Sequence, residues 1–158
     1  GVVFSHQAYL HIRENRDLIM GEDEIPEFPL WNKEGTFVLE EWVLIQHNIE
    51  DVKRLMWDYV GIVRSNLRLQ RAYRRILLLD EEIKDYYRRG TLSSRLVELR
   101  NMATVAKLII RSAMARVESR GLHYNTDYPD PVEGMRKNVV LRTGSEPVLM
   151  SLASVTFG

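Results

Sequence analysis

The segment NLRLQRAYRRILLLDEEIKDYYRRG, residues 66–90, carries the clearest structural signal in the chain. Its apolar residues recur every three or four positions, as on one face of an α-helix; they are Leu69, Ala72, Ile76, Leu79, Ile83 and Tyr86. Gly90 follows the last of them and is typical of a position just past a helix end. We therefore expect a helix over about 66–89.

A second helix is expected before this segment. Asn48, with Asp51 three residues later, resembles a helix-start box. An apolar stripe with helical spacing then follows, made of Ile49, Val52, Leu55, Met56, Tyr59, Ile62 and Val63. Gly61 lies inside this stripe, where glycine weakens a helix, so we expect another group to pack closely there.

A third helix is expected after the segment, from Ser93 or Ser94 to about Ser119, with Gly121 just beyond its end. Its stripe contains several alanines, which allow close approach of neighbouring helices; it comprises Leu96, Leu99, Ala103, Ala106, Ile110, Ala113 and Val117. Because the connections are short, neighbouring helices should be antiparallel. The sequence thus predicts a three-helix bundle over 48–121.

An additional helix and a linker are expected before the bundle. Residues 1–20 have an apolar helical stripe but no capping residue before it, so we expect this helix to continue from a missing upstream domain. Residues 21–47 are expected to be an acidic linker, because Pro26 and Pro29 interrupt any helix there.

The tail after the bundle, residues 122–158, has a different pattern. Its prolines exclude long helices, and the segments 138–142 and 148–157 favour short strands, which are marginal on their own. We expect this tail to lie extended against a surface. The predicted fold class is therefore all-α: a three-helix bundle with an extra N-terminal helix and an irregular, partly β-prone C-terminal tail.

Composition excludes several classes of function. The 158 residues suit one domain and contain no cysteine, which excludes disulfides and thiolate metal sites. Lys and Arg balance Asp and Glu at 22 each, so neither nucleic acid nor membrane is an expected partner. The lack of cysteine, of a signal peptide and of a long apolar run leads us to expect a cytoplasmic protein.

Charge is nevertheless uneven along the chain. Residues 1–60 contain 5 basic and 12 acidic residues, whereas the remainder contains 17 basic and 10 acidic ones. Four arginines follow at helical spacing and share one face if the helix is continuous: Arg64, Arg68, Arg71 and Arg75, with Arg74 beside them. This face could bind phosphate or nucleic acid. We favour a salt-bridged face instead, because the net charge is zero.

Other candidate groups are sparse. His6 and His11 are five positions apart and diverge on a helix, so no metal site is predicted. The sequence has no G-x-G-x-x-G fingerprint and no phosphate-binding loop. The acidic run Asp80-Glu81-Glu82 is interpreted as a solvated helix face, as is Asp85, which can pair with Arg88.

The densest polar cluster follows the expected end of the third helix. It comprises Arg116, Glu118, Ser119, Arg120, His123, Tyr124 and Asp127. Cations are favoured at a helix C-terminus, but this density of donors and acceptors also suits a hydrogen-bonded docking surface. A weaker alternative is an active-site edge with His123 as acid or base.

These residues also carry a resemblance. The segment ESRGLHY at 118–124, followed by Asp127-Tyr128-Pro129, resembles the C-terminal signature of the L-aspartate oxidase family. The segments IQHN at 45–48 and MWDYVGIVR at 56–64 resemble the opening of that family's helical domain, and ELRNM at 98–102 resembles its last long helix. The resemblance covers about residues 1–130.

The resemblance implies a parent enzyme with FAD that oxidises L-aspartate to iminoaspartate for NAD biosynthesis. It implies that the flavin-binding and capping domains, with all catalytic residues, precede this chain. No catalytic, cofactor-binding or metal residue is therefore assigned here, and the cluster at 116–127 is expected to dock on the missing domains. Quinolinate synthase is a further candidate partner, and the separate chain could self-associate through its exposed N-terminal stripe.

Two alternatives remain. The chain could be a freestanding helical interaction domain, or the equivalent domain of a succinate dehydrogenase or fumarate reductase flavoprotein. That wider family has a similar Arg-Gly-x-His turn, but normally carries alanine at the position of Leu122 and lacks the YVGIV run at 59–63.

Overall fold

The computed structural model describes residues 2–19, 27, 29–30, 32, 34, 36, 42–142 and 144–151. The chain has two compact units, Gly1–Asn32 and Lys33–Gly158. The first contains helices α1 (Val2–Glu14) and α2 (Arg16–Ile19), which confirms a helical N-terminus. The apolar side chains of α1 face solvent, with Val2 86% and Phe4 81% exposed.

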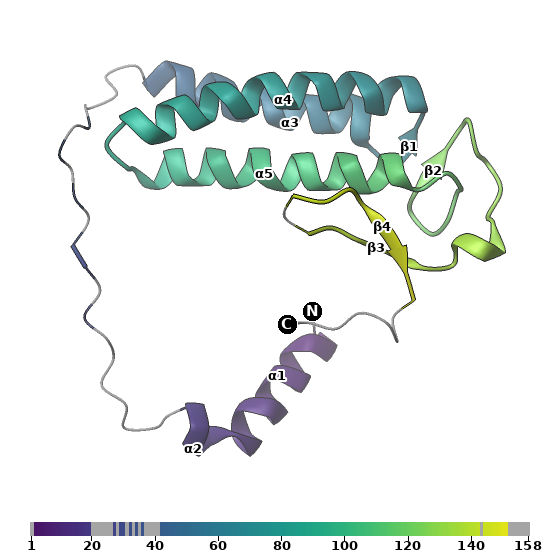
Figure 1. Ribbon diagram of the computed structural model, residues 1–158, viewed down its shortest axis with the longest axis horizontal. Helices are drawn as coiled ribbons and strands as arrows, with labels where there is room; N and C mark the ends of the chain where they lie inside the picture. The colour runs from purple at the N-terminus through teal and green to yellow at the C-terminus, as the bar shows by residue number, and fades with distance from the viewer. Residues whose placement is uncertain are drawn as a thin grey trace. The chain divides into compact units, whose positions relative to one another are not determined.

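The second unit is built around three helices that all contact one another (Figure 1). They are α3 (Trp42–Val60), α4 (Asn66–Arg89) and α5 (Ser94–Ala115). Their predicted apolar stripes meet in the core, where α5 contributes the buried alanines 103, 106 and 113. These small side chains let α5 lie close to its neighbours, so the predicted three-helix bundle is confirmed.

Hydrogen bonds at the helix ends explain the bounds of α4. The Ser65 hydroxyl precedes α4 and accepts a hydrogen bond from the Arg68 N–H at 3.3 Å, which caps the first turn. At the other end, the Gly90 N–H donates to the Tyr86 carbonyl at 2.8 Å. Gly90 ends the helix as expected, although its φ of −84° is not left-handed.

The bounds of α3 differ from those expected. This helix begins at Trp42, so Asn48 is a buried interior residue rather than a cap, and residues 42–47 belong to the bundle rather than to a linker. The predicted linker residues 21–26 and 37–41 lie outside the described residues. The helix also ends earlier than expected, at Val60, which leaves Ile62 and Val63 exposed after it.

Helix α5 is likewise shorter than predicted. It begins at Ser94, where the Ser93 hydroxyl accepts from the Leu96 N–H at 3.3 Å, but it ends at Ala115. Val117 is therefore not on the helix stripe and is 43% exposed. Gly121 lies in a later turn with φ +58°, a conformation that glycine tolerates best.

Two pairs of short strands complete this unit. Strand β1 (Val63–Arg64) pairs in parallel with β2 (Tyr124–Asn125) and so joins the α3–α4 connection to the segment after α5. A 3₁₀ turn, η1 (Glu133–Met135), leads to β3 (Asn138–Val140), which pairs antiparallel with β4 (Val148–Met150).

The β3–β4 hairpin lies along α5 (Figure 1), and β3 contacts that helix. Arg111 of α5 donates to the Ser145 carbonyl at 2.7 Å and thereby fixes the hairpin turn. The β-prone tail is confirmed by strands at 138–140 and 148–150, and residues 152–157 of the predicted second segment lie outside the described residues. None of the helices in the described part of the chain is long and apolar enough to cross a membrane.

Candidate functional site

The predicted polar cluster forms a compact turn, residues 116–130, which we call the polar turn. Glu118 lies at its centre and is fully buried. Arg120 binds this carboxylate through Nε and Nη2, both at 3.0 Å, and Arg116 Nη1 binds it at 2.5 Å. The Val132 N–H adds a fourth hydrogen bond at 2.7 Å. A buried charge needs such compensation, and Glu118 has it from two cations and an amide.

The electrostatics of Glu118 follow from these contacts. The hydrogen bonds from Arg120, together with those from Val132 and Arg116, outweigh the opposite effect of burial and lower the pKa of Glu118 to about 2. Glu118 is therefore ionised throughout the physiological range. It holds both arginines in place instead of serving as a proton donor or acceptor.

Both arginines also bind the backbone beyond the turn. Arg116 donates to the carbonyls of Met135 at 3.1 Å and Lys137 at 2.6 Å, and Arg120 donates to that of Val132 at 3.1 Å. The ion pairs thus attach the start of the tail to the end of α5.

Ser119 and Asn125 close the turn from within. The Ser119 hydroxyl accepts from the Asn125 N–H at 2.9 Å and donates to the Tyr128 carbonyl at 2.7 Å. Asn125 is 1% exposed, and its Oδ1 accepts from the Asp127 N–H at 3.0 Å. This side chain to backbone bond two residues on is typical of an Asx turn.

The polar turn is joined to the start of α4. Asp127 Oδ2 accepts from the Asn66 N–H at 2.6 Å, which satisfies a free donor of the first turn of α4. The amide of Asn125 donates to Asn66 Oδ1 at 3.1 Å. The Thr126 N–H donates to the Arg64 carbonyl at 2.9 Å, extending the β1–β2 pairing. The sequence therefore identified Asp127 as a candidate site residue, but it did not identify Asn66 and Asn125, which bind Asp127.

His123 also links the polar turn to the segment between α3 and α4, through Arg64. Arg64 Nη1 lies 2.7 Å from His123 Nδ1, and a guanidinium can only donate, so Nδ1 accepts and the neutral ring carries its hydrogen on Nε2. Nε2 is buried and has no partner among the described residues. Burial, followed by the nearby charge of Arg64, lowers the pKa of His123.

The position of Arg64 corrects the expectation of a continuous arginine face. Arg64 lies in β1, before the Ser65 cap, and its Nε donates to the Gly61 carbonyl at 2.8 Å. Only the later arginines share α4. The Gly61 break followed by the β-branched pair Ile62-Val63 is the sequence signal that could have indicated a strand.

The interpretation of Asp80 as part of a solvated face is also wrong. Asp80 is 5% exposed, and its Oδ2 binds Lys107 of α5 at 2.5 Å and Lys84 at 3.0 Å. Burial alone would raise its pKa, but the hydrogen bonds from the two lysines hold the pKa of Asp80 below its ordinary value. The predicted pair of Asp85 and Arg88 is present at 3.8 Å.

The remaining predicted site residue, Tyr124, is 43% exposed, and its neighbour Leu122 is 80% exposed. Most polar groups of the turn thus bind other groups of this chain, whereas these two side chains face outward. A docking role for the turn stays a prediction.

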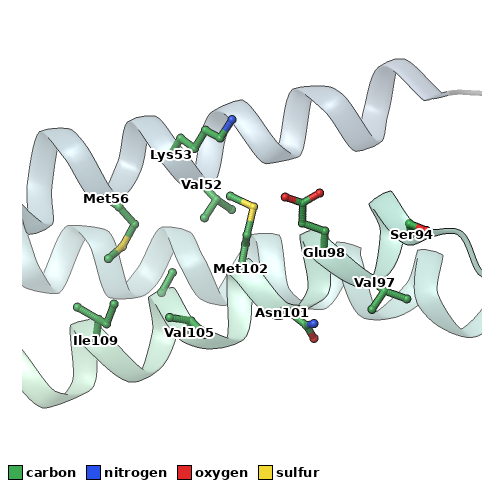
Figure 2. Close-up of a pocket in the computed structure, with 11 residues that line it drawn as sticks. Val52, Lys53, Met56, Ser94, Val97, Glu98, Asn101, Met102, Val105 and Ile109 are labelled. Atoms are coloured by element: carbon green, nitrogen blue, oxygen red, sulfur yellow. The ribbon is translucent and has the colours of Figure 1, made fainter. Parts of the chain in front are cut away.

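An apolar groove of about 610 Å³ runs between α3 and α5 (Figure 2). Figure 2 shows Val52 and Met56 of α3 facing Met102 of α5, with Val105 and Ile109 further along. Methionine side chains are flexible and suit irregular contacts. The polar side chains that line this groove are Lys53, Ser94, Glu98 and Asn101.

The fold and the polar turn define a helical-bundle domain stabilised by buried ion pairs. The sequence profile of the family described as "Fumarate reductase flavoprotein C-term" matches residues 49–152. The chain therefore belongs to the family of fumarate reductase flavoprotein C-terminal domains.

Individual relatives agree with this assignment. The chain is 51% identical over 118 residues to the L-aspartate oxidase of Pseudomonas aeruginosa, and the aligned segment covers 74% of this chain and 22% of that protein. It is 49% identical over 112 residues to the L-aspartate oxidase of Yersinia pestis, covering 71% and 21%. These matches confirm the resemblance to L-aspartate oxidases.

One solved structure shows the same fold. The Mycobacterium smegmatis Sdh1 complex in the apo form matches 90% of this chain and 24% of the matched chain, with 21% identity and a TM-score of 0.51. This chain spans about a fifth of the length of the curated relatives that it matches.

Proposed function

We propose that this chain is the C-terminal helical domain of an FAD-dependent L-aspartate oxidase, which converts L-aspartate to iminoaspartate in NAD biosynthesis. The observation that supports this proposal is the identity of about half of the aligned residues with proteins of that name. The chain would belong to a cytoplasmic protein, in line with its lack of cysteine.

The residues of this chain do not fit the flavin itself. Its glycines are scattered, and no glycine-rich turn precedes a helix as pyrophosphate binding requires. We therefore place FAD and the catalytic residues in the other domains of the parent protein, where the flavin supplies the redox chemistry.

The role proposed for this chain is structural support of those domains. The polar turn is held rigid by Glu118 and presents Leu122 and Tyr124 outward. An exposed leucine beside a partly exposed tyrosine on a rigid turn suits docking on another surface. The partner is the flavin-binding and capping part of the same protein; quinolinate synthase and a second copy are further proposed partners.

The activity is tested on the native protein captured with an antibody against this chain. The proposal expects a polypeptide several times longer than 158 residues, with flavin absorption bands and hydrogen peroxide formed on addition of L-aspartate. A colourless protein of about this length would overturn it and favour a freestanding interaction domain.

The docking role is tested separately in the parent protein with Leu122→Ser. We expect the variant to lose flavin during gel filtration, because the apolar contact between domains is removed. Val148→Ser is the matched control, since Val148 is 52% exposed in β4, away from the polar turn. Equal flavin retention in both variants would contradict docking through the turn.

A second candidate is the equivalent domain of a fumarate reductase or succinate dehydrogenase flavoprotein. The description of the matched family favours this candidate, whereas the names of the relatives at about 50% identity favour the oxidase. Capture from cells separates the two, because a dehydrogenase flavoprotein would bring an iron–sulfur protein with it and an oxidase would not.

A further inference from the structure

A second groove, of about 870 Å³, lies between α3 and α4. Its volume falls within the range of small-molecule sites. Arg71, Arg74 and Arg75 line it from α4, and leucines from both helices form its apolar part. We call it the arginine groove and propose that it binds an elongated small organic anion with a carboxylate or phosphate group at one end.

The three arginines are the first support for this proposal. Arg74 and Arg75 lie three and four positions after Arg71 on α4, where like charges repel. All three are exposed, and no carboxylate of the described residues lies within ion-pairing distance of any of them. The salt-bridged interpretation of this arginine face is therefore wrong for the described part of the chain. Guanidinium groups bind both carboxylate and phosphate through paired hydrogen bonds.

Asn48 is the second and independent support. It lines the same groove from α3 and is 5% exposed, yet its side-chain amide has no hydrogen-bond partner among the described residues. Only His123 Nε2 is both fully buried and unpaired among the described residues, so the Asn48 amide is open to the groove. A ligand in the groove could therefore bind it directly.

The arrangement of these groups along the groove indicates the shape of the ligand. Residues 61–65 join α3 to α4 by a short connection, so the two helices run antiparallel. Arg71 is 5 residues past the start of α4, about 8 Å along the axis, and Asn48 is 12 residues before the end of α3, about 18 Å. Arg71 and the amide are therefore about 10 Å apart along the groove, and Arg75 lies between them.

The two acidic groups of the groove lie at different levels: Asp51 is level with Arg75, and Glu82 lies beyond Asn48. Asp51 is next to it on α3 and is bound by His47 at 3.5 Å. Glu82 lines the groove from the later part of α4 and is exposed. A ligand with an anionic end at Arg71 and a hydrogen-bond donor directed toward Asn48 and Glu82 matches this order of groups, and the leucines would contact its apolar middle.

Binding is tested by isothermal titration of this chain with two probes. AMP carries a phosphate and para-aminohippurate a carboxylate, and each has an amino group at its other end. We expect one of them to bind with a Kd below about 1 mM and at least tenfold more tightly than inorganic phosphate or adenosine. The better probe identifies the anionic group.

Variants connect binding to the groove. The double variant Arg71→Ala, Arg75→Ala should weaken binding at least tenfold, because charge-assisted hydrogen bonds are lost. Arg68→Ala is the matched control, since Arg68 is exposed on the same helix but does not line the groove. It should change the Kd less than twofold.

Asn48→Leu separates a binding role from a structural one. Because the amide is unpaired in the free protein, an apolar side chain of similar size should leave the melting temperature unchanged or raise it. The same substitution should weaken binding of the better probe. The proposal is overturned if neither probe binds, or if the arginine double variant binds as the unsubstituted chain does.

Discussion

Glu118→Gln removes one negative charge from the centre of the polar turn while keeping the volume of the side chain. Arg116, Arg120 and the Val132 N–H donate to the two carboxylate oxygens of Glu118. In glutamine, one of these oxygens is replaced by an NH₂ group, which donates and cannot accept, and the other carries no full charge. Loss of one partner of a buried ion pair costs about 3–5 kcal/mol. The difference between an ordinary pKa of 4.5 and the pKa of about 2 gives a similar value, about 3 kcal/mol.

Urea unfolding followed by far-ultraviolet circular dichroism measures this loss. With a slope of about 1–3 kcal/mol per molar urea, the midpoint should fall by about 1 M or more. Glu133→Gln is the control: Glu133 is 81% exposed at its side chain and pairs with Arg136 at 3.5 Å, so its loss should cost less than about 1 kcal/mol. A loss below about 1 kcal/mol for Glu118→Gln would refute the argument that this ion-pair cluster holds the turn.

The direction of the pH dependence follows from the same group. The pKa of Glu118 is lower in the folded protein than its ordinary value. The stabilisation of the folded protein by the Glu118 carboxylate is therefore complete above about pH 4.5 and is lost as the pH falls toward about 2. Glu118→Gln should lack this part of the acid sensitivity.

Three further predictions concern other parts of the second unit. Asp80→Ala should lower stability by about 1–3 kcal/mol in urea unfolding, because Lys107 loses its buried partner. Gly121→Ala should cost about 1–2 kcal/mol in the same assay, because φ is +58° there although space is open; an unchanged midpoint would show that the turn relaxes. The pKa of His123 is lowered in the folded protein, so the folded state favours the neutral ring. The stability of the folded protein should therefore decline as the pH falls below about 6.5, the ordinary pKa of histidine. Melting temperatures between pH 5 and 7 should fall less steeply for His123→Phe, and parallel curves would exclude this histidine as the cause.

The sequence predicted the bundle well because its core depends on local periodicity. Helix α4 has the expected bounds, since Ser65 and Gly90 act at its two ends through hydrogen bonds within a few residues. The start of α3 was missed because Asn48 looks like a cap in sequence, whereas Ile45 before it is already part of the core. The identity of a capping residue does not show whether the chain before it is helical.

The composition of the polar turn could be predicted, but its contacts could not. The partners of His123 and Asp127 are Arg64 and Asn66, about 60 residues earlier. No local pattern predicts such a long-range pairing. The turn was expected to present its polar groups to another domain, whereas Glu118 is buried within this chain.

Flavin reduction in the captured native protein is the decisive test of whether this chain is part of an L-aspartate oxidase. The visible absorption of the oxidised flavin is followed without oxygen while L-aspartate or succinate is added. We expect bleaching by L-aspartate and none by succinate. Bleaching by succinate alone, or the absence of a flavin band, would contradict it.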